Sequence, residues 1–174
     1  TTLEGLLLGL GNRVTPTLTT KLNQLGLPGQ PRPRGYPIAV WQQAARLLGE
    51  GAFPEIPEDE AQFQLGRRLV FGLGETLSGK AAAILSRRLG PRTAALRLPV
   101  ADYHGCNFGS VKALERSSHE VELRCLDYRF HPAFGRGCYQ AAVQVAGGVE
   151  VWCEVRADDR EAHAVTYRLG WAPV

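Results

Sequence analysis

The stretch Val149-Glu150-Val151-Trp152-Cys153-Glu154-Val155-Arg156 alternates apolar and polar positions, with Trp152 at one of the polar ones. A period of two residues is typical of a β-strand that buries one face and exposes the other, as in antiparallel sheets. The same alternation recurs over residues 120–125 and 165–169, and residues 108–114 form a weaker candidate strand. We therefore expect an antiparallel sheet in the second half of the chain.

A short helix is predicted between the two pairs of strands, over residues 137–145. Tyr139, Ala142 and Val143 share one helical face there, and Gly147-Gly148 would end the helix. The second half of the chain then has the order β-β-α-β-β.

The first half, to about residue 90, has helical periodicity instead. Thr15-Pro16 supplies an N-cap and a proline at the first helical position. Glu58-Asp59-Glu60 places negative charge in the first turn of a later helix, and a last helix over residues 80–89 ends at Gly90-Pro91.

The fold class that follows is α+β, with N-terminal helices packed on a C-terminal antiparallel sheet of β-β-α-β-β order. We expect a single domain over residues 1–174. It would have a mainly helical part, 1–90, and a β-β-α-β-β part, 91–174.

Composition excludes several classes of protein. With 44% hydrophobic and 21% charged residues, the chain is far from the signature of disorder. A net charge of +3 is too small to indicate a nucleic-acid partner. The longest leucine run, Leu6-Leu7-Leu8, is interrupted by Gly9, so we expect no membrane span. No secretory signal is recognisable, and we expect a cytoplasmic protein.

Four cysteines occur in the second half, at widely spaced positions without a Cys-x-x-Cys pair: Cys106, Cys125, Cys138 and Cys153. Three disulfide pairings are arithmetically open. In a cytosolic chain, apolar surroundings favour free, buried thiols.

Gly74-Glu75-Thr76-Leu77-Ser78-Gly79-Lys80-Ala81 matches most of a phosphate-binding loop. The position after the lysine should carry a hydroxyl for magnesium, and here it is Ala81. We expect a junction between two helices, with Lys80 exposed.

The remaining chemistry-bearing residues form no catalytic or metal-binding pattern. No serine lies in a Gly-x-Ser-x-Gly setting. None of the four histidines has the spacing of a zinc site; they are His104, His119, His131 and His163. Asp158-Asp159 and Glu161 are expected to be solvated charges of a hairpin. We expect no catalytic residue, no metal and no cofactor, and the pattern gives no support to an enzyme.

Two functions from different classes stay open. The first is a non-catalytic small-molecule-binding or sensory module, in which Phe63 and Phe71 on a glycine-rich helix border an apolar ligand cleft. A fatty acid or similar apolar molecule would suit that cleft. The competing interpretation of both phenylalanines is a fully packed core.

The second is a protein–protein interaction or dimerisation adaptor without a ligand, acting as a homodimer or through a partner protein. The candidate partner or anion contacts are arginines of the helical part together with two tryptophans: Arg87, Arg88, Arg92, Trp152 and Trp171. The alternative for the arginines is a solvated helix face.

Glycine, proline and leucine positions carry a resemblance over essentially the whole chain. Leu65-Gly66-Arg67, Leu89-Gly90-Pro91-Arg92 and Tyr167-Arg168-Leu169-Gly170-Trp171 resemble an uncharacterised paralogous family known mainly from myxobacteria. In the second half, Gly135-x-Gly137 precedes a short helix, and two strands joined by a charged hairpin follow. This part also resembles a looser group of vinyl-reductase-type domains, haem-based nitric oxide sensors and Bet3-like subunits of the Golgi tethering complex.

That wider resemblance implies helices packed on an antiparallel sheet, with an apolar cavity in some members. It does not imply haem for this chain. The sensors' Tyr-x-Ser-x-Arg would fall at Tyr128-Arg129-Phe130-His131-Pro132, which lacks both the serine and the final arginine.

Overall fold

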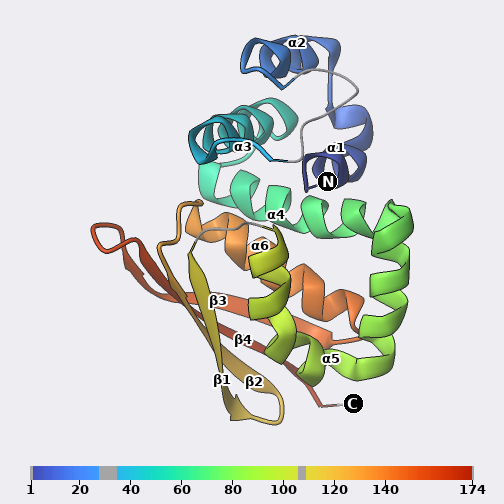
Figure 1. Cartoon of the computed structure of the whole chain (residues 1–174), viewed down its shortest axis with the longest axis vertical. Helices are drawn as coiled ribbons and strands as arrows, with labels where there is room; N and C mark the ends of the chain where they lie inside the picture. The colour runs from blue at the N-terminus through green and yellow to red at the C-terminus, as the bar shows by residue number, and fades with distance from the viewer. Residues whose placement is uncertain (1, 28–34, 106–108, 174) are drawn as a thin grey trace.

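The computed structural model describes residues 2–27, 35–105 and 109–173, and it has two parts joined along a central helix. The helices, in chain order, are α1 Thr2–Leu10, the 3₁₀ turn η1 Gly11–Arg13, α2 Pro16–Gln24, α3 Ile38–Ala52, α4 Glu58–Glu75, α5 Leu77–Gly105 and α6 Pro132–Val145. Helices α1–α3 lie on one side of α4, and α6 and the sheet lie on the other (Figure 1).

The four strands form one antiparallel sheet. They are β1 Ser110–Ser117, β2 Glu120–Leu126, β3 Val149–Asp159 and β4 Ala164–Ala172, and their order across the sheet is β1-β2-β4-β3. The last strand of the chain is therefore central and pairs with both β2 and β3. The α+β class and the β-β-α-β-β order along the chain are confirmed.

The helical part is longer than the sequence pattern predicts. Helix α1 was not predicted, because its glycines look like interruptions, and α5 continues to Gly105 instead of ending at 89. Gly90, with φ 77° and ψ 169°, breaks α5 into two helical halves, and Pro91 stands at the start of the second. Helix α6 likewise begins earlier than predicted, at Pro132.

Glycines place the backbone of α4 directly against its two neighbours. A Cβ atom on Gly66 would overlap the carbonyl oxygen of Phe134 in α6, and one on Gly137 would overlap that of Phe63 in α4. On the other side, a Cβ on Gly72 would overlap the carbonyl oxygen of Gly5 in α1. Helices can approach this closely only where the side chain is a hydrogen atom.

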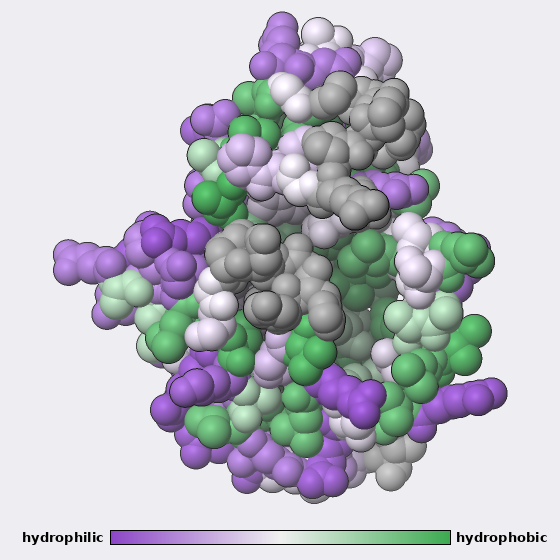
Figure 2. Space-filling view, viewed as in Figure 1, coloured by the Kyte–Doolittle hydropathy of each residue, from purple (hydrophilic) through white to green (hydrophobic). Residues whose placement is uncertain are grey.

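Two hydrophobic cores result. The first fills the space between α1, α2, α3 and α4, and it includes the fully buried Leu6, Leu48 and Leu65. The second lies between the sheet, α6 and the second half of α5, and it includes Leu123 and Tyr167. Large apolar side chains also remain exposed, and Figure 2 shows many of them gathered along the edge where Figure 1 places α5.

The segment that imitates a phosphate-binding loop is the junction between α4 and α5. The Thr76 hydroxyl accepts a hydrogen bond from Gly79 N at 3.1 Å, and a Cβ on Gly79 would overlap the carbonyl oxygen of Leu73. Lys80 lies at the surface, 3.8 Å from Glu75. The predicted helix junction is confirmed.

Three of the four cysteines lie within the described residues, and no disulfide joins any two of them. Cys125 and Cys153 are buried as predicted, whereas Cys138 is half-buried. Cys106 and the side chain of His104 lie outside the described residues. Among the helices described, none is long and apolar enough to cross a membrane.

Replacing Gly66 with alanine should destabilise the fold, because the new methyl group would push α6 away from α4. We expect the free energy of unfolding to fall by about 2 kcal/mol or more, as for overpacked cores. Urea denaturation followed by circular dichroism measures this change.

Gly74→Ala is the matched control, since it lies in the same helix and a Cβ there would meet no atom within 4 Å. It should raise the unfolding free energy by up to about 1 kcal/mol through helix propensity. Equal effects of the two substitutions would contradict the backbone contact.

Candidate functional site

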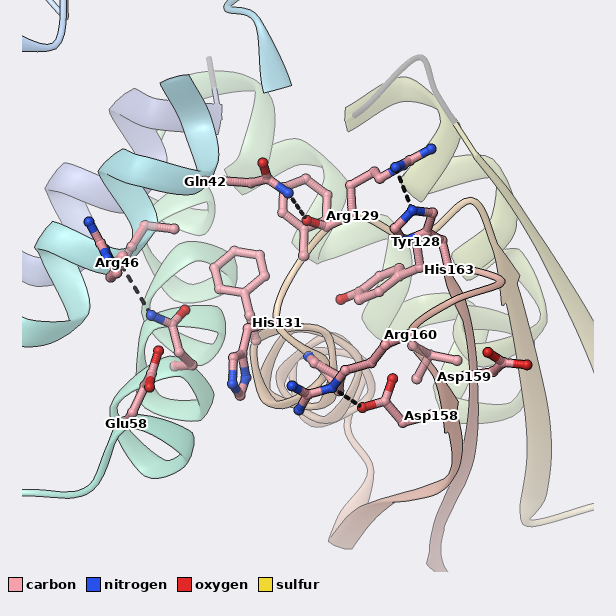
Figure 3. Close-up of a pocket in the computed structure, with 16 residues that line it drawn as sticks. Gln42, Arg46, Glu58, Tyr128, Arg129, His131, Asp158, Asp159, Arg160 and His163 are labelled. Carbon is pink, nitrogen blue, oxygen red and sulfur yellow. Dashed lines mark hydrogen bonds and ion pairs between the residues drawn. The ribbon is translucent and has the colours of Figure 1, made fainter. Parts of the chain in front are cut away.

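A cleft of about 410 Å³ opens where the helical part meets the sheet part. Its lining residues come from α3, the start of α4, the β2–α6 connection, the start of α6 and the β3–β4 hairpin (Figure 3). Several segments distant in the sequence therefore contribute to one site.

The helical wall presents polar side chains one turn apart. Gln42 and Arg46 lie on α3, and Glu58 and Gln62 lie on α4. Gln62 is buried and donates to the carbonyl oxygen of Ala45 at 3.3 Å, so it ties α4 to α3. In Figure 3 the side chains of Arg46 and Glu58 stand on the same side of the cleft.

The β2–α6 connection crosses the cleft and is held from both sides. Gln42 of α3 donates to the carbonyl oxygen of Arg129 at 2.5 Å. The Arg129 guanidinium contacts Asp127 at 2.6 Å and His163 Nε2 at 2.7 Å. Because an arginine can only donate, His163 Nε2 is the acceptor in this contact.

His131 occupies the end of this connection and caps α6. Its Nδ1 accepts from the Ala133 backbone N–H at 3.3 Å, and its Nε2 lies 3.4 Å from an Asp59 carboxylate oxygen. Both ring nitrogens are therefore engaged with the protein.

The β3–β4 hairpin forms the opposite wall. Arg160 contacts Asp158 at 3.2 Å, and Asp159 accepts from the Ala162 backbone N–H at 3.0 Å. His163 has a φ of 49°, in the left-handed region that non-glycine residues rarely adopt. The Tyr128 backbone N–H donates to the His163 carbonyl at 2.7 Å, which fixes the hairpin against the β2–α6 connection.

Two tyrosines, the half-buried Tyr128 and the fully buried Tyr167, support the cleft. Tyr128 donates to the Tyr167 hydroxyl, which in turn donates to the carbonyl oxygen of Pro132 at 3.0 Å. Burial raises the pKa of both phenols well above the ordinary value. The two rings stack edge-to-face at 6.1 Å, and Phe130 continues the stack at 5.8 Å from Tyr128.

The cleft carries both signs of charge. Its arginines are Arg46, Arg129 and Arg160, and its carboxylates are Glu58, Asp158 and Asp159. Within the described residues that line it, no serine or cysteine nucleophile is present. The arrangement is chemically suited to binding a small polar molecule through charge-assisted hydrogen bonds.

The two phenylalanines predicted to contact a ligand lie outside this cleft. Arg67 stacks on both rings at 5.7 Å, and Arg136 stacks on Phe63 at 4.3 Å. Phe63 and Phe71 thus border the surface between α4 and α6, under two guanidinium groups.

The predicted partner contacts are dispersed over the molecule. Arg87 donates to the Val145 carbonyl at 3.3 Å, Arg88 is exposed, and Arg92 forms a bidentate pair with Glu115.

On the outer face of the sheet, Trp152 lies across Gly170 and remains 37% exposed. Trp171 is buried at 4% exposure and stacks on His119, so Trp152 is the accessible one of this pair.

Sequence reasoning missed the cleft because its charged residues look like ordinary loop residues. Asp158 and Asp159 were interpreted as solvated hairpin charges, and His131 and His163 as a loop and a strand-end histidine. A usable signal was the concentration of arginine, histidine and aspartate in two short segments, 127–131 and 158–163. The spacing of two segments along a chain does not reveal that a sheet brings them together.

Comparisons with known proteins agree with the fold described above. Residues 1–172 match the family described as "Protein of unknown function (DUF2378)". No curated protein matches the chain in sequence.

Solved H-NOX structures are similar in fold over nearly the whole chain. An unliganded Fe(II) H-NOX protein from K. algicida has 10% identity and a TM-score of 0.69, covering 99% of this chain and 95% of its own. An oxygen-binding H-NOX domain related to soluble guanylate cyclases has 10% identity and a TM-score of 0.69, covering 97% and 92%. The predicted resemblance to haem-based sensors is confirmed at the level of the fold.

The residues of the cleft do not fit a haem group. A haem iron needs an axial ligand with a free donor atom, and haem proteins commonly use histidine. His131 has both nitrogens engaged, and His163 Nε2 is held by Arg129. Within the described residues, no group of three histidine, cysteine or acidic side chains could hold a metal ion either.

Tyr167→Phe should destabilise the protein and loosen the cleft. The substitution leaves the Pro132 carbonyl and the Tyr128 hydroxyl without their partner in a buried setting, which costs about 1–3 kcal/mol. Thermal and urea denaturation measure the loss. Tyr36→Phe is the control, because the buried Tyr36 hydroxyl has no hydrogen-bond partner among the described residues. Equal losses of unfolding free energy in both variants would contradict the hydrogen bonds that Tyr167 makes to Tyr128 and Pro132.

Cys153 should resist alkylation in the folded protein. Burial raises the pKa of its thiol to about 12, so the reactive thiolate is scarce at pH 8. We expect iodoacetamide to label Cys153 only after unfolding, as measured by peptide mass spectrometry. Rapid labelling of native Cys153 would contradict its burial.

The same burial predicts a dependence of stability on pH. The folded Cys153 thiol keeps a proton that the unfolded thiol releases above its ordinary pKa of about 9, so the free energy of unfolding should decline above that pH.

Proposed function

We propose that this chain, which belongs to the family described as "Protein of unknown function (DUF2378)", is a non-catalytic sensory module that binds a small molecule in the charged cleft. The observation that carries the proposal is the composition of the cleft. A single 410 Å³ space is lined by polar groups from both parts of the fold. Such convergence of charged groups in one concave site is characteristic of ligand sites.

The charges of the cleft favour a polar ligand that bears both an anionic and a cationic group. Arg46 and Glu58 stand on the helical wall, and Asp158 and Arg160 on the hairpin wall, so each wall offers both signs. A carboxylate of the ligand would pair with an arginine while its ammonium group pairs with an aspartate or glutamate. Amino acids are the smallest molecules of this class.

Binding there would connect the two cores. Direct contact across the cleft includes the hydrogen bond from Gln42 to the Arg129 carbonyl, and a ligand would add further bridges between α3 and the hairpin. A ligand can shift a conformational equilibrium only as far as it prefers one arrangement of its contacts. Contacts on both walls provide that preference, which is why a sensory role suits the site.

An apolar ligand beside Phe63 and Phe71 is the alternative within the same function. Those rings lie under the guanidinium groups of Arg67 and Arg136, which makes their surroundings partly polar. The charged cleft is better supported as the ligand site, because its groups come from more segments. A fatty acid recovered with the protein would reverse this preference.

A partner-binding adaptor is the second candidate function. It is favoured by one specific observation, the exposed apolar residues of α5, of which Leu77 is 91% exposed. This function does not exclude the first, because a sensory module needs a surface through which to signal.

Native mass spectrometry of the freshly purified protein tests the ligand proposal. We expect additional mass that disappears under denaturing conditions, and a thermal-shift screen of the twenty amino acids should identify at least one that raises the melting temperature. Arg46→Ala should reduce that shift severalfold, because it removes a cation from the helical wall. Arg156→Ala, an exposed arginine of β3 outside the cleft, is the matched control. Equal shifts in both variants would place the ligand elsewhere.

A further inference from the structure

The first half of α5, residues 77–89, is inverted relative to an ordinary surface helix. Three of its four large apolar side chains face solvent: Leu77 is 91% exposed, Ile84 58% and Leu85 54%. The residues turned toward the rest of the protein are Gly79, Ala83, Ser86, Leu89 and Gly90, of which only Leu89 is large. Surface helices usually place their apolar stripe toward the core.

The exposed apolar residues form a continuous stripe. Leu77, Ala81, Ile84 and Leu85 are separated by four, three and one positions, which places them on one helical face, and Arg88 follows one turn beyond Ile84. Figure 2 shows apolar side chains gathered along this edge of the molecule. A contiguous apolar stripe of this kind indicates a contact surface.

This helix cannot rotate to bury its stripe, because both of its ends are fixed. At the start, a Cβ on Gly79 would overlap the Leu73 carbonyl, and Thr76 caps the helix through Gly79 N. At the other end, Gly90 holds a φ of 77°. Arg87 is tied in addition to the Val145 carbonyl of α6.

One edge of the stripe is basic. Lys80 and Arg87 lie seven positions apart beside the apolar residues, and both are exposed, as is Arg88 at the end of the stripe. Among the described residues, the carboxylate that pairs with this edge is that of Glu75, which is 3.8 Å from Lys80 and itself 71% exposed. Within the described residues, positive charge therefore dominates this edge.

We propose that this stripe, Leu77, Ala81, Ile84, Leu85 and Arg88, docks an amphipathic helix of a partner protein whose apolar face is flanked by aspartate or glutamate. Charge complementarity determines the choice of partner, since acidic side chains would pair with Lys80, Arg87 and Arg88. The stripe is about 17 Å long, which suits a partner helix of at least three turns. The inference goes beyond the ligand proposal, because none of these residues lines the cleft.

The same charges argue against the other occupants. In an antiparallel pair of copies, the edge carrying Lys80 and Arg87 would meet its own counterpart, and in a parallel pair Arg88 would meet Arg88. A membrane surface favours tryptophan and phenylalanine anchors, and residues 77–89 contain no aromatic side chain.

Fluorescence anisotropy on the full chain tests the proposal with two labelled 18-residue helical peptides. Both carry the same leucine stripe, and one has glutamate and the other lysine along its flank. We expect the acidic peptide to bind, more weakly at high salt, and the basic peptide to bind at least tenfold more weakly. Ile84→Glu should weaken binding of the acidic peptide tenfold or more.

Leu126→Glu is the matched control, because Leu126 is a 51% exposed apolar residue at the end of β2 that leads into the β2–α6 connection, away from the first half of α5 (Figure 1). It should leave the affinity unchanged, and since both side chains are exposed, neither variant should lower the melting temperature appreciably. Equal binding of the two peptides, or binding unaffected by Ile84→Glu, would overturn the proposal.

Two further measurements test whether a second copy of the chain or a membrane, instead of a partner helix, covers the stripe. Analytical ultracentrifugation that shows a dimer converted to monomer by Ile84→Glu would assign the surface to a second copy. Co-sedimentation with phosphatidylserine-containing vesicles, abolished by the same substitution, would assign it to a membrane. Either result overturns a partner helix and leaves the ligand proposal for the cleft standing, because Ile84 does not line that cleft.

Discussion

The close contact of α4 with α1 on one side and α6 on the other is the constraint on which the rest of the structure depends. Gly66 and Gly137 allow the backbones of α4 and α6 to touch, and Gly72 allows the same between α4 and α1. Side chains larger than hydrogen at these positions would separate the helices by the width of a methyl group or more. Because α4 belongs to both parts of the fold, its position sets the distance between the helical core and the sheet, and hence the width of the cleft.

The cleft is a consequence of that spacing and of two loops that close it. Helix α4 brings Glu58 and Gln62 to one wall, while α6, held against α4, positions the segment that carries Arg129 and His131. The hairpin reaches the same place because β4 is central in the sheet and ends its pairing with β3 at this edge. Solved H-NOX structures share this arrangement of helices and sheet at about 10% identity. In this chain the cleft is lined by charged side chains of both signs. The fold places the cleft, and the residues that line it decide which chemistry it can support.

The exposed stripe on α5 and the charged cleft lie on different surfaces that share the same framework. The first half of α5 follows directly from the C-terminus of α4, and Arg87 contacts the last turn of α6. Helices α4 and α6 also determine where the cleft lies. A change in the spacing of α4 and α6 would therefore alter both surfaces, and the proposed sensory role requires a physical connection of this kind.

The sequence by itself determined the α+β class, the order β-β-α-β-β and the helix junction at Thr76, because alternation, helical spacing and capping act over a few neighbouring residues. It did not reveal α1 or the second half of α5, where glycine and proline have tertiary roles: Gly5 packs against α4, and Gly90 redirects the chain. The cleft and the inverted helix were decided only by the tertiary structure. Whether Asp159 or His163 is a solvated loop residue or part of a site depends on which distant segment the sheet places beside it, and local sequence contains no record of that distance.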